Sequence, residues 1–487
     1  MLFLAVDLGS TNTKAALYDE RMHCLAIKSA PVDYIRADGF VEFDPEQYLA
    51  RVFDLIRTVA ATRATSSELI SITLTGQAES LLVLDGEKNP LMNAISWMDE
   101  RSTQECATLE TAFLKDVCYA HTGQPAALPT WPATKILWLR NHRPGDFLAA
   151  AYFVLLKDYV VYRLTGILLA DCSIATFTYY FDIYEHRYWP EMLAFLGIHE
   201  EQLPPLCEPC EAIGTLLPEV AARIGLENIT LVNNGTLDHF SGMIGTGNVN
   251  EGQLSLSTGT VLGLSTLAAS PIRRDTGIPM HYGFLPDRHV MLSASESGGA
   301  SLEWYKNTFM PDVSFVDIDR EVLLRYPGDV LFLPYLNGSN GPEFDQDVCG
   351  VFYGLRSKHD SYDLALAVMD GVSHLLRKNC DRIRESGAAI EQILATGGGA
   401  KSTLWCQMQA DITGIPVCTP AEKEAALLGA ALIGAVSAGV FPSYSAAVNQ
   451  VVHFSDVFYP NISDMNERRH RQFVELYDAM IKVQLIQ

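Results

Sequence analysis

Two stretches of the chain, one at the start and one past the middle, repeat the same local pattern. Residues 2–18 read as an apolar strand, a turn of small polar residues and a second strand, and residues 253–264 follow the same order. An internal repeat at such a distance favours two domains of similar plan that face each other. We therefore predict one domain over residues 1–247 and another over residues 248–487.

The length and charge of the chain fit this division and narrow the choice of partners. A chain of 487 residues is too long for one simple core, and 48% hydrophobic with 19% charged residues is an ordinary globular composition. A formal charge of -23 argues against nucleic acid or an anionic membrane as the main partner, although an anionic substrate in a locally positive pocket stays compatible. Because the chain has no signal-peptide pattern and no uncharged apolar run long enough to span a bilayer, we predict a cytoplasmic protein.

The 10 cysteines are scattered, which suits free thiols in a reducing compartment. One pair is closer, in the segment Cys207-Glu-Pro-Cys210, and a CxxC segment can be redox-active or half of a zinc site. No second CxxC completes a zinc site, so we predict no functional role for this pair.

The opening turn has the composition of a phosphate-binding site. Asp7 stands where the first apolar strand ends, and small hydroxyl and amide residues follow it before Lys14. Small residues let backbone N–H groups approach a phosphate closely, and hydroxyls add further donors. Because a carboxylate repels phosphate, Asp7 suits this place only with a divalent cation or a water between them. An ordinary hairpin with a polar turn is the alternative interpretation.

The next elements predict a mixed α/β sheet with a ligand site at its edge. Strands over residues 23–29 and 69–75 flank a helix that begins at Asp44, a good N-cap that is followed by Pro. The polar run Thr75–Ser80 comes directly after the second of these strands, which is where α/β folds place ligands. The segment Ile95–Arg101 adds an aromatic residue, acids and a base, for which surface ion pairing is an equally good explanation.

Two later loops carry further candidate residues. A strand over residues 229–233 leads to Asp238 and a run of small residues, and Asp238 alone fits a helix N-cap as well as a catalytic role. A strand over residues 393–396 ends in the glycines Gly397–Gly399, and Ser402 then caps a helix. Three glycines let a flat ligand lie against the backbone, and the helix N-terminus behind them favours an anion.

Taken together, these motifs resemble those of the FGGY family of carbohydrate kinases. The family's first signature is similar to residues 132–142, and its second to residues 350–355 followed, after seven residues, by residues 363–370. The stretch Phe332–Gly338 ahead of the second signature is also typical. The resemblance covers nearly the whole chain and implies an α/β protein with a duplicated actin-like, ribonuclease-H-like fold, in which two domains surround an ATP and sugar cleft.

The resemblance also implies roles for individual residues. Asp238 matches the catalytic base, which takes the proton from a sugar hydroxyl as that oxygen attacks the γ-phosphorus of ATP. Asp7 matches the residue that holds Mg²⁺ through water. Closure of the two domains would exclude water from the transfer. The ATP-binding residues implied in the same way are Thr11, Asn12, Thr13 and Lys14 in a first phosphate loop, Thr258 and Gly259 in a second, and Gly398, Gly399 and Ala400 on the adenosine side.

The sugar site is the part of the family pattern from which this chain departs. Xylulose kinases usually have Met-His after the glutamine of the substrate loop and glycerol kinases have Arg-Glu, whereas this chain has Ala78-Glu79. The segment from Trp97 to Arg101 looks like the W-x-D-x-R segment of xylulose kinases. We therefore predict a ketopentose substrate such as D-xylulose, with glycerol, a ketohexose or gluconate as alternatives. The substrate-binding residues implied are Gln77, Glu79, Trp97, Asp99 and Asp238.

Two other classes of function stay open at this point. A nucleotide-binding regulator would keep the fold and lose the transfer, but the base, Asp238, is present. A hydrolase of the same superfold would use water as the acceptor, and the sugar-side residues 76–101 speak against it. Homodimers are common in the family, so the resemblance implies a homodimer by analogy alone.

Overall fold

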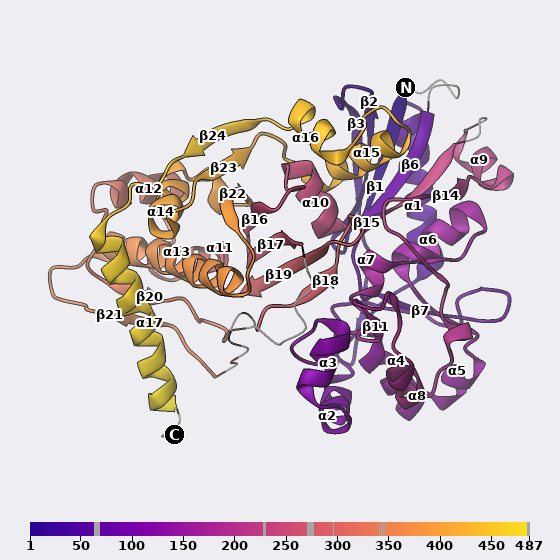
Figure 1. The fold of residues 1–487 in the computed structure, drawn as a ribbon, viewed down its shortest axis with the longest axis horizontal. Helices are drawn as coiled ribbons and strands as arrows, with labels where there is room; N and C mark the ends of the chain where they lie inside the picture. The colour runs from indigo at the N-terminus through magenta and orange to yellow at the C-terminus, as the bar shows by residue number, and fades with distance from the viewer. Residues whose placement is uncertain are drawn as a thin grey trace.

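Figure 1 shows the computed structural model, in which two lobes, each built around a β-sheet, lie side by side. The structure describes residues 1–62, 69–226, 230–269, 277–295, 297–339, 341, 343, 345 and 347–484. Within these ranges, no helix combines the length and the hydrophobicity that a bilayer span requires.

The first lobe is organised around a six-stranded sheet in the order β14-β15-β6-β1-β2-β3. β1 pairs with β2 in antiparallel and with β6 in parallel, so the predicted opening hairpin is confirmed. Apart from the half-buried Asp7, β1 is buried along its whole length, as its apolar run predicts for a central strand. The strands are β1 (Leu2–Leu8), β2 (Asn12–Asp19), β3 (Cys24–Pro31), β6 (Leu69–Gly76), β14 (Ala212–Thr215) and β15 (Leu231–Leu237).

The second lobe repeats the plan of the first. Its seven-stranded sheet has the order β18-β19-β17-β16-β22-β23-β24. β16 pairs with β17 in antiparallel and with β22 in parallel, as β1 does with β2 and β6, so the duplication predicted from the repeat is confirmed. The strands are β16 (Gly252–Thr258), β17 (Leu262–Ala268), β18 (Met280–Tyr282), β19 (His289–Ser295), β22 (Ile390–Thr396), β23 (Val417–Pro420) and β24 (Phe454–Phe458).

A third sheet, which the sequence analysis missed, extends the first lobe. Its order is β4-β5-β8-β7-β9, and the predicted succession of three strands, a helix and a strand was therefore incomplete. β4 (Ile35–Ala37) is short and exposed throughout, so it has no hydrophobic alternation to detect. The other strands are β5 (Phe40–Phe43), β7 (Leu81–Leu84), β8 (Ala94–Ile95) and β9 (Tyr152–Leu155). The helices of this region are α2 (Thr103–Ala112), α3 (Lys115–Thr122), α4 (Pro132–His142), α5 (Pro144–Ala149) and α8 (Pro190–Leu196).

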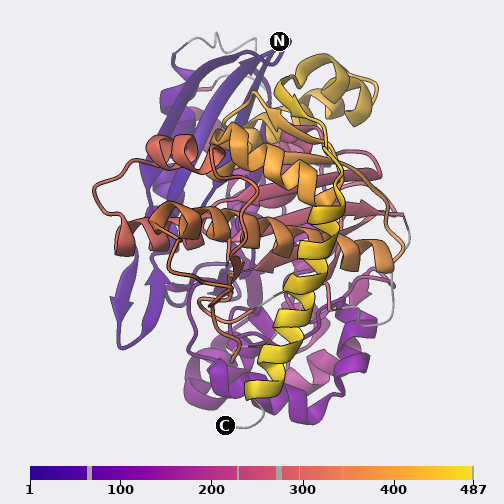
Figure 2. The same ribbon diagram turned by 90° about the vertical axis from the view of Figure 1, so that its left-hand side faces the viewer.

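The predicted helix starts are confirmed where a capping side chain is present. Asp44 caps α1 (Pro45–Ala60) and Ser402 caps α14 (Thr403–Thr413), each by accepting a backbone N–H of the first turn. In the second lobe, α17 (Asp464–Gln484) packs against α13 (Ser361–Glu385), as Figure 2 shows. The remaining elements are α6 (Leu156–Thr165), α7 (Cys172–Ala175), α9 (Pro218–Ile224), α11 (Gly299–Phe309), α12 (Phe315–Leu323), α16 (Tyr444–Val451), the 3₁₀ turns Glu200–Gln202 and Gly399–Lys401, and the short strands β10 (Ala170–Asp171), β11 (Phe181–Asp182), β12 (Arg187–Tyr188), β13 (Leu206–Cys207), β20 (Leu331–Leu333) and β21 (Val351–Tyr353).

Two helices, α10 (Asp238–Thr246) and α15 (Ala425–Ser437), pack against each other between the lobes (Figure 1). A Cβ on Gly245 would lie 1.9 Å from the carbonyl oxygen of Ala425, and a Cβ on Gly429 would lie 1.8 Å from that of Ser241, so only glycine permits this approach. α15 also packs on β1 and β6 of the first lobe, although it follows residue 247 in the chain. The division of the chain at that residue stays a prediction.

Candidate active site

The opening turn holds a buried carboxyl group opposite a lysine. The antiparallel register pairs Asp7 with Lys14, and the Nζ of Lys14 lies 2.6 Å from Oε2 of Glu424 at the start of α15. Oδ1 of Asp7 is buried and has no hydrogen-bond partner. Burial raises the pKa of Asp7 to about 8, and the negative charge of Asp238 adds to the rise. A buried carboxyl oxygen without a partner, beside two other acids, fits a site for a divalent cation.

Asp238 stands where β15 ends and α10 begins. Leu237 occupies the N-cap position, so Asp238 is the first residue inside the helix and the N-cap interpretation was wrong. Its Oδ1 accepts the backbone N–H of His239 at 2.7 Å, and its side chain is half-buried. This position, at the carboxyl end of a strand and the start of a helix, aims the carboxylate into the space between the lobes.

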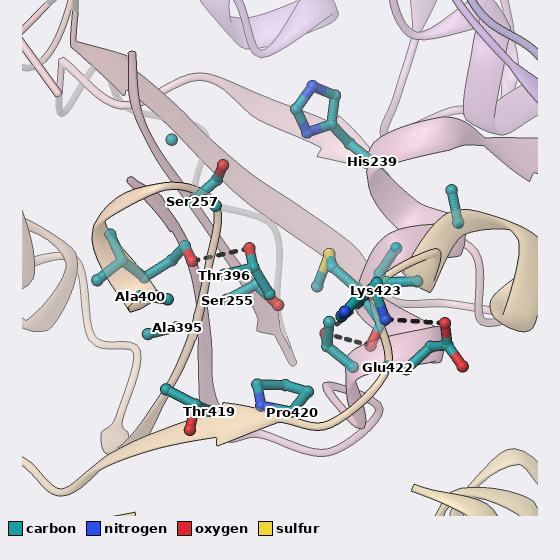
Figure 3. A pocket seen from close by; sticks show the side chains of 18 of the residues that line it. His239, Ser255, Ser257, Ala395, Thr396, Ala400, Thr419, Pro420, Glu422 and Lys423 are labelled. Carbon is teal, nitrogen blue, oxygen red and sulfur yellow. Dashed lines mark hydrogen bonds between the residues drawn. The ribbon is translucent and has the colours of Figure 1, made fainter. Parts of the chain in front are cut away.

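A cleft of about 1260 Å³ runs between the lobes. It brings together the opening turn, the start of α10 and the loop after β22. Figure 3 shows Ser257, Thr396 and Ala400 on one wall and Glu422 and Lys423 on another, with His239 projecting from the start of α10. The predicted site residues that line this cleft are Asp7, Lys14, Asp238, Gly398 and Ala400.

The residues predicted for the two phosphate loops differ in their burial and in whether they line the cleft. The side chain of Thr13 is fully buried and that of Thr258 nearly so, and neither lines the cleft. Thr11 is exposed and Asn12 half-buried, on the turn itself. A Cβ on Gly399 would lie 2.6 Å from Cγ2 of Thr258, so the loop after β22 and the turn after β16 touch directly. The roles of Thr13 and Thr258 in ATP binding stay predictions, and their buried side chains do not line the cleft.

The loop after β6 supplies the predicted sugar side. Gln77 is buried, and its Oε1 accepts the hydroxyl of Ser80 at 2.8 Å. Glu79 has a φ of +68°, a left-handed conformation that is strained for a residue with a side chain. Burial, with a smaller contribution from the charge of Asp238, raises the pKa of Glu79 to about 7 although the ammonium of Lys135 opposes the rise. Glu79 and Asp238 therefore lie within electrostatic reach of each other.

The W-x-D-x-R segment has a different role from the one predicted for its acid. Asp99 is fully buried, and its carboxylate accepts hydrogen bonds from the side chain of Arg101 at 2.7 Å and the backbone N–H of Val41 at 2.5 Å. Both oxygens are thus occupied by protein groups, so the predicted sugar contact of Asp99 is corrected to a structural ion pair. The backbone N–H of Trp97 donates to the hydroxyl oxygen of Ser80, and the Trp97 side chain is 36% exposed, so it stays a candidate for sugar contact.

Sequence reasoning missed the side chains that hold these loops. Lys135 is fully buried in α4, and its Nζ donates to the backbone carbonyls of Glu79 at 3.2 Å and Ser96 at 2.9 Å. Burial lowers the pKa of Lys135 to about 7. A charged residue in an apolar helical run was the available signal for Lys135, whereas the pairing of Glu424 with Lys14 has no local signal.

The comparisons with known proteins agree over the whole chain. Residues 2–245 match the N-terminal domain of the FGGY family of carbohydrate kinases, and residues 254–438 match its C-terminal domain. The chain belongs to the FGGY family of carbohydrate kinases. The protein is thus a phosphotransferase, and members of this family of kinases use ATP. It has the two-domain actin-like, ribonuclease-H-like fold of the family, as predicted.

The relatives are sugar kinases of similar length. The chain is 29% identical to a xylulose kinase of Bacillus subtilis over 97% of this chain and 95% of the relative. It is 27% identical to an L-xylulose/3-keto-L-gulonate kinase of Escherichia coli over 98% and 97% of the two chains. A solved structure, described as a xyloylose kinase from Brucella ovis, superposes with a TM-score of 0.91 at 29% identity and covers 99% of this chain and 100% of its own.

Two further expectations concern metals. Mg²⁺ keeps several waters and is usually held by one or two carboxylates together with substrate phosphates, so the buried oxygen of Asp7 would suffice as the protein's part of such a site. Among the residues that the structure describes, no group of three or more His, Cys, Asp or Glu could hold a metal ion, and Cys207 and Cys210 are free thiols. Burial raises the pKa of Cys210 to about 12, which suits an inert thiol.

Proposed function

We propose that this kinase transfers the γ-phosphoryl group of ATP, with Mg²⁺, to a hydroxyl of a neutral ketopentose such as D-xylulose. One observation carries the proposal: Asp238 lines the same cleft as Asp7 and Lys14 of the phosphate turn, and its charge also raises the pKa of Glu79 in the sugar loop. The base accepts the proton of the sugar hydroxyl while the hydroxyl oxygen attacks the γ-phosphorus, so it has to lie between the sugar site and the phosphate site.

Each charged group has a separate task in this reaction. Asp238 takes the proton from the sugar hydroxyl, and the N–H of His239 fixes the orientation of its carboxylate. Asp7 holds the cation through water, and Lys14 exchanges Glu424 for phosphate oxygens. Bound Mg²⁺ would neutralise the charge on the phosphate oxygens. Closure of the cleft excludes water, so that the sugar and not water accepts the phosphoryl group.

The charges on the sugar side favour a neutral substrate over an aldonate. Glu79 and Asp238 are both acids, and the nearest buried cation, Lys135, is committed to two backbone carbonyls. A sugar carboxylate placed here would meet like charge in a site of low dielectric, whereas hydroxyl groups can donate to Glu79. The similarity to xylulose kinases supports a ketopentose among the neutral sugars.

The test is coupled ADP release with MgATP across D-xylulose, L-xylulose, ketohexoses, gluconate and glycerol, with a control without sugar. We expect turnover with a neutral ketose, and loss of at least about 10³-fold in kcat for Asp238→Asn with ATP binding retained. Asp54→Asn, an exposed change on α1, is the matched control and should turn over normally. Sugar-independent turnover would favour the hydrolase alternative, and an Asp238→Asn enzyme at the wild-type rate would refute the base.

The domain division at residue 247, the homodimer and the cytoplasmic location belong to the same proposal. They are expected of a metabolic kinase of this family and are supported by analogy. Sedimentation of the purified chain would decide the oligomeric state.

A further inference from the structure

The strand that ends in Asp238 is irregular just before it reaches that residue. β15 pairs with β6 in parallel, but the register shifts between Asn233 and Thr236, so Asn234 and Gly235 stand outside the ladder. Gly235 has a φ of +60°, and a Cβ on it would lie 1.7 Å from a backbone oxygen of β6. A bulge of this kind re-aims the chain beyond it, and here the chain beyond it carries Asp238.

A buried ammonium group holds the first displaced carbonyl. Lys157 is 0% exposed, and its Nζ donates to the carbonyl oxygen of Asn234 at 2.7 Å and to Oδ2 of Asp171 at 2.9 Å. Burial alone would lower the pKa of Lys157, but Asp171 and Asp158 raise it above its usual value, so the group stays charged. A charged donor makes a markedly stronger hydrogen bond to a carbonyl than a neutral donor does.

Asp171 links the same ion pair to the second half of the bulge. Its carboxylate accepts the backbone N–H and the hydroxyl of Ser173 at 2.8 and 3.0 Å. The Ser173 hydroxyl also lies 2.7 Å from Oγ1 of Thr236, and Thr75 donates to the Thr236 carbonyl at 2.8 Å. All of these side chains are buried, so water does not compete for the bonds.

The Cys207–Cys210 segment closes the other side of the bulge. The N–H of Cys210 donates to the carbonyl oxygen of Gly235 at 2.7 Å, and the Cys210 carbonyl accepts Nδ2 of Asn233 at 2.9 Å. Nδ2 of Asn234 donates to the carbonyl of Glu208 at 2.8 Å. The segment therefore supports β15 mainly through its backbone, which explains why it needs neither a disulfide nor a metal.

We propose that Lys157 and Asp171 are positioning residues, which hold the bulge of β15 so that Asp238 meets the sugar hydroxyl in line with the transferred phosphoryl group. The inference rests on the proposed function of Asp238 as the base. A buried ion pair contributes little net stability, because desolvation offsets most of its attraction, so geometry is the better reason for a charge pair under this strand. A displacement of about 1 Å at a reacting group costs roughly 100-fold in rate.

The test is the double variant Lys157→Met/Asp171→Asn, which removes both charges of the pair together. The buried Asp158, 3.9 Å from Nζ of Lys157, loses this cation, but burial already raises its pKa to about 7, so it can take up a proton and stay neutral. We expect kcat to fall about 10- to 100-fold, with the KM values for ATP and sugar within about threefold of wild type. The matched control is Lys378→Met/Glu343→Gln, which removes a lysine–carboxylate pair (2.6 Å, 11% and 10% exposed) in the other lobe and should leave kcat unchanged. Equal losses of kcat in the two double variants, or an unchanged kcat in the first, would overturn the proposal.

Combining the Lys157→Met/Asp171→Asn changes with Asp238→Asn distinguishes an effect on the position of Asp238 from a general loss of structure. If the ion pair acts through Asp238, removing it should cost the Asp238→Asn enzyme about nothing further, whereas a fully additive loss would contradict positioning. An Asp238→Asn enzyme with wild-type turnover would instead refute the proposed function itself. Should the double variant fail to fold, Ser173→Ala removes the hydroxyl that bridges Asp171 and Thr236 and leaves the ion pair in place, and kcat should fall about 3- to 10-fold at constant KM. An unchanged kcat in Ser173→Ala would then overturn the inference.

Discussion

The buried carboxyl group of Asp7 makes a quantitative prediction about nucleotide binding. Burial and the charge of Asp238 raise its pKa to about 8, so the free enzyme carries a proton on Asp7 at neutral pH. The carboxylate form is needed to hold a cation, so binding of Mg²⁺ with nucleotide has to expel that proton. From a pKa of about 8, the proton released should be about 0.9 per site at pH 7, about 0.5 at pH 8 and about 0.1 at pH 9.

Titration calorimetry of MgADP in buffers of different ionisation enthalpy measures this number directly. Asp7→Asn keeps the shape of the side chain but cannot titrate, so the difference in proton release between wild type and Asp7→Asn isolates the one carboxyl group. Below pH 8 the apparent affinity of the wild type for MgADP should also fall by about tenfold for each pH unit, because a growing share of the free enzyme carries the proton on Asp7. Equal proton release in the two proteins, or a difference that does not shrink between pH 7 and pH 9, would refute this assignment of Asp7.

Two further substitutions test the sugar side. Glu79→Gln should raise the KM for sugar by about tenfold with little change in the KM for ATP. The sugar affinity of the wild type should improve as the pH rises through about 7, because only the ionised carboxylate is a pure acceptor, and Glu79→Gln should lose this pH dependence. Steady-state kinetics between pH 6 and 8 measure both effects, and equal effects on the two substrates would remove Glu79 from the sugar site. Asp99→Asn should lower the free energy of unfolding by about 1–3 kcal/mol, since the buried Arg101 loses one of its two carboxylate partners and keeps Glu42, while the KM for sugar stays near wild type. Denaturant unfolding measures the loss, and a raised KM in a stable protein would restore Asp99 as a sugar contact.

The parts of the fold that the sequence predicts are those with a local signal. β1 and β16 are buried strands, and each is followed by a polar turn and a second strand, so two short stretches suffice to reveal the duplication. Asp44 and Ser402 mark helix starts because the capping bond joins residues two or three apart. β4 and β5 escape because they belong to a sheet whose other members come from distant segments, and their own pattern is weak.

The candidate site shows the same limit at the level of single side chains. The position of Asp7 follows from a strand end that the sequence marks, whereas β15 runs on to Leu237, four residues beyond the predicted end at Asn233, and so carries Asp238 directly after it. The hydrogen bonds that occupy the carboxylate of Asp99 cannot be predicted in this way, because one of its donors is the backbone N–H of Val41, on a strand that the sequence pattern does not reveal. A W-x-D-x-R segment reads the same whether its acid faces a ligand or an arginine two residues away.

The helix α15 limits how far the two halves of the chain are independent. It follows β23 of the second lobe, yet it covers β1 and β6 of the first, and Glu424 at its start pairs with Lys14. Residues of the second half thus complete both the core and the phosphate turn of the first lobe. α15 also packs on α10, where Gly245 and Gly429 leave no space for a side chain. That contact joins α10, which begins with Asp238, to α15, whose N-cap residue Glu424 pairs with Lys14, so one tight helix pair links the candidate base to the phosphate turn.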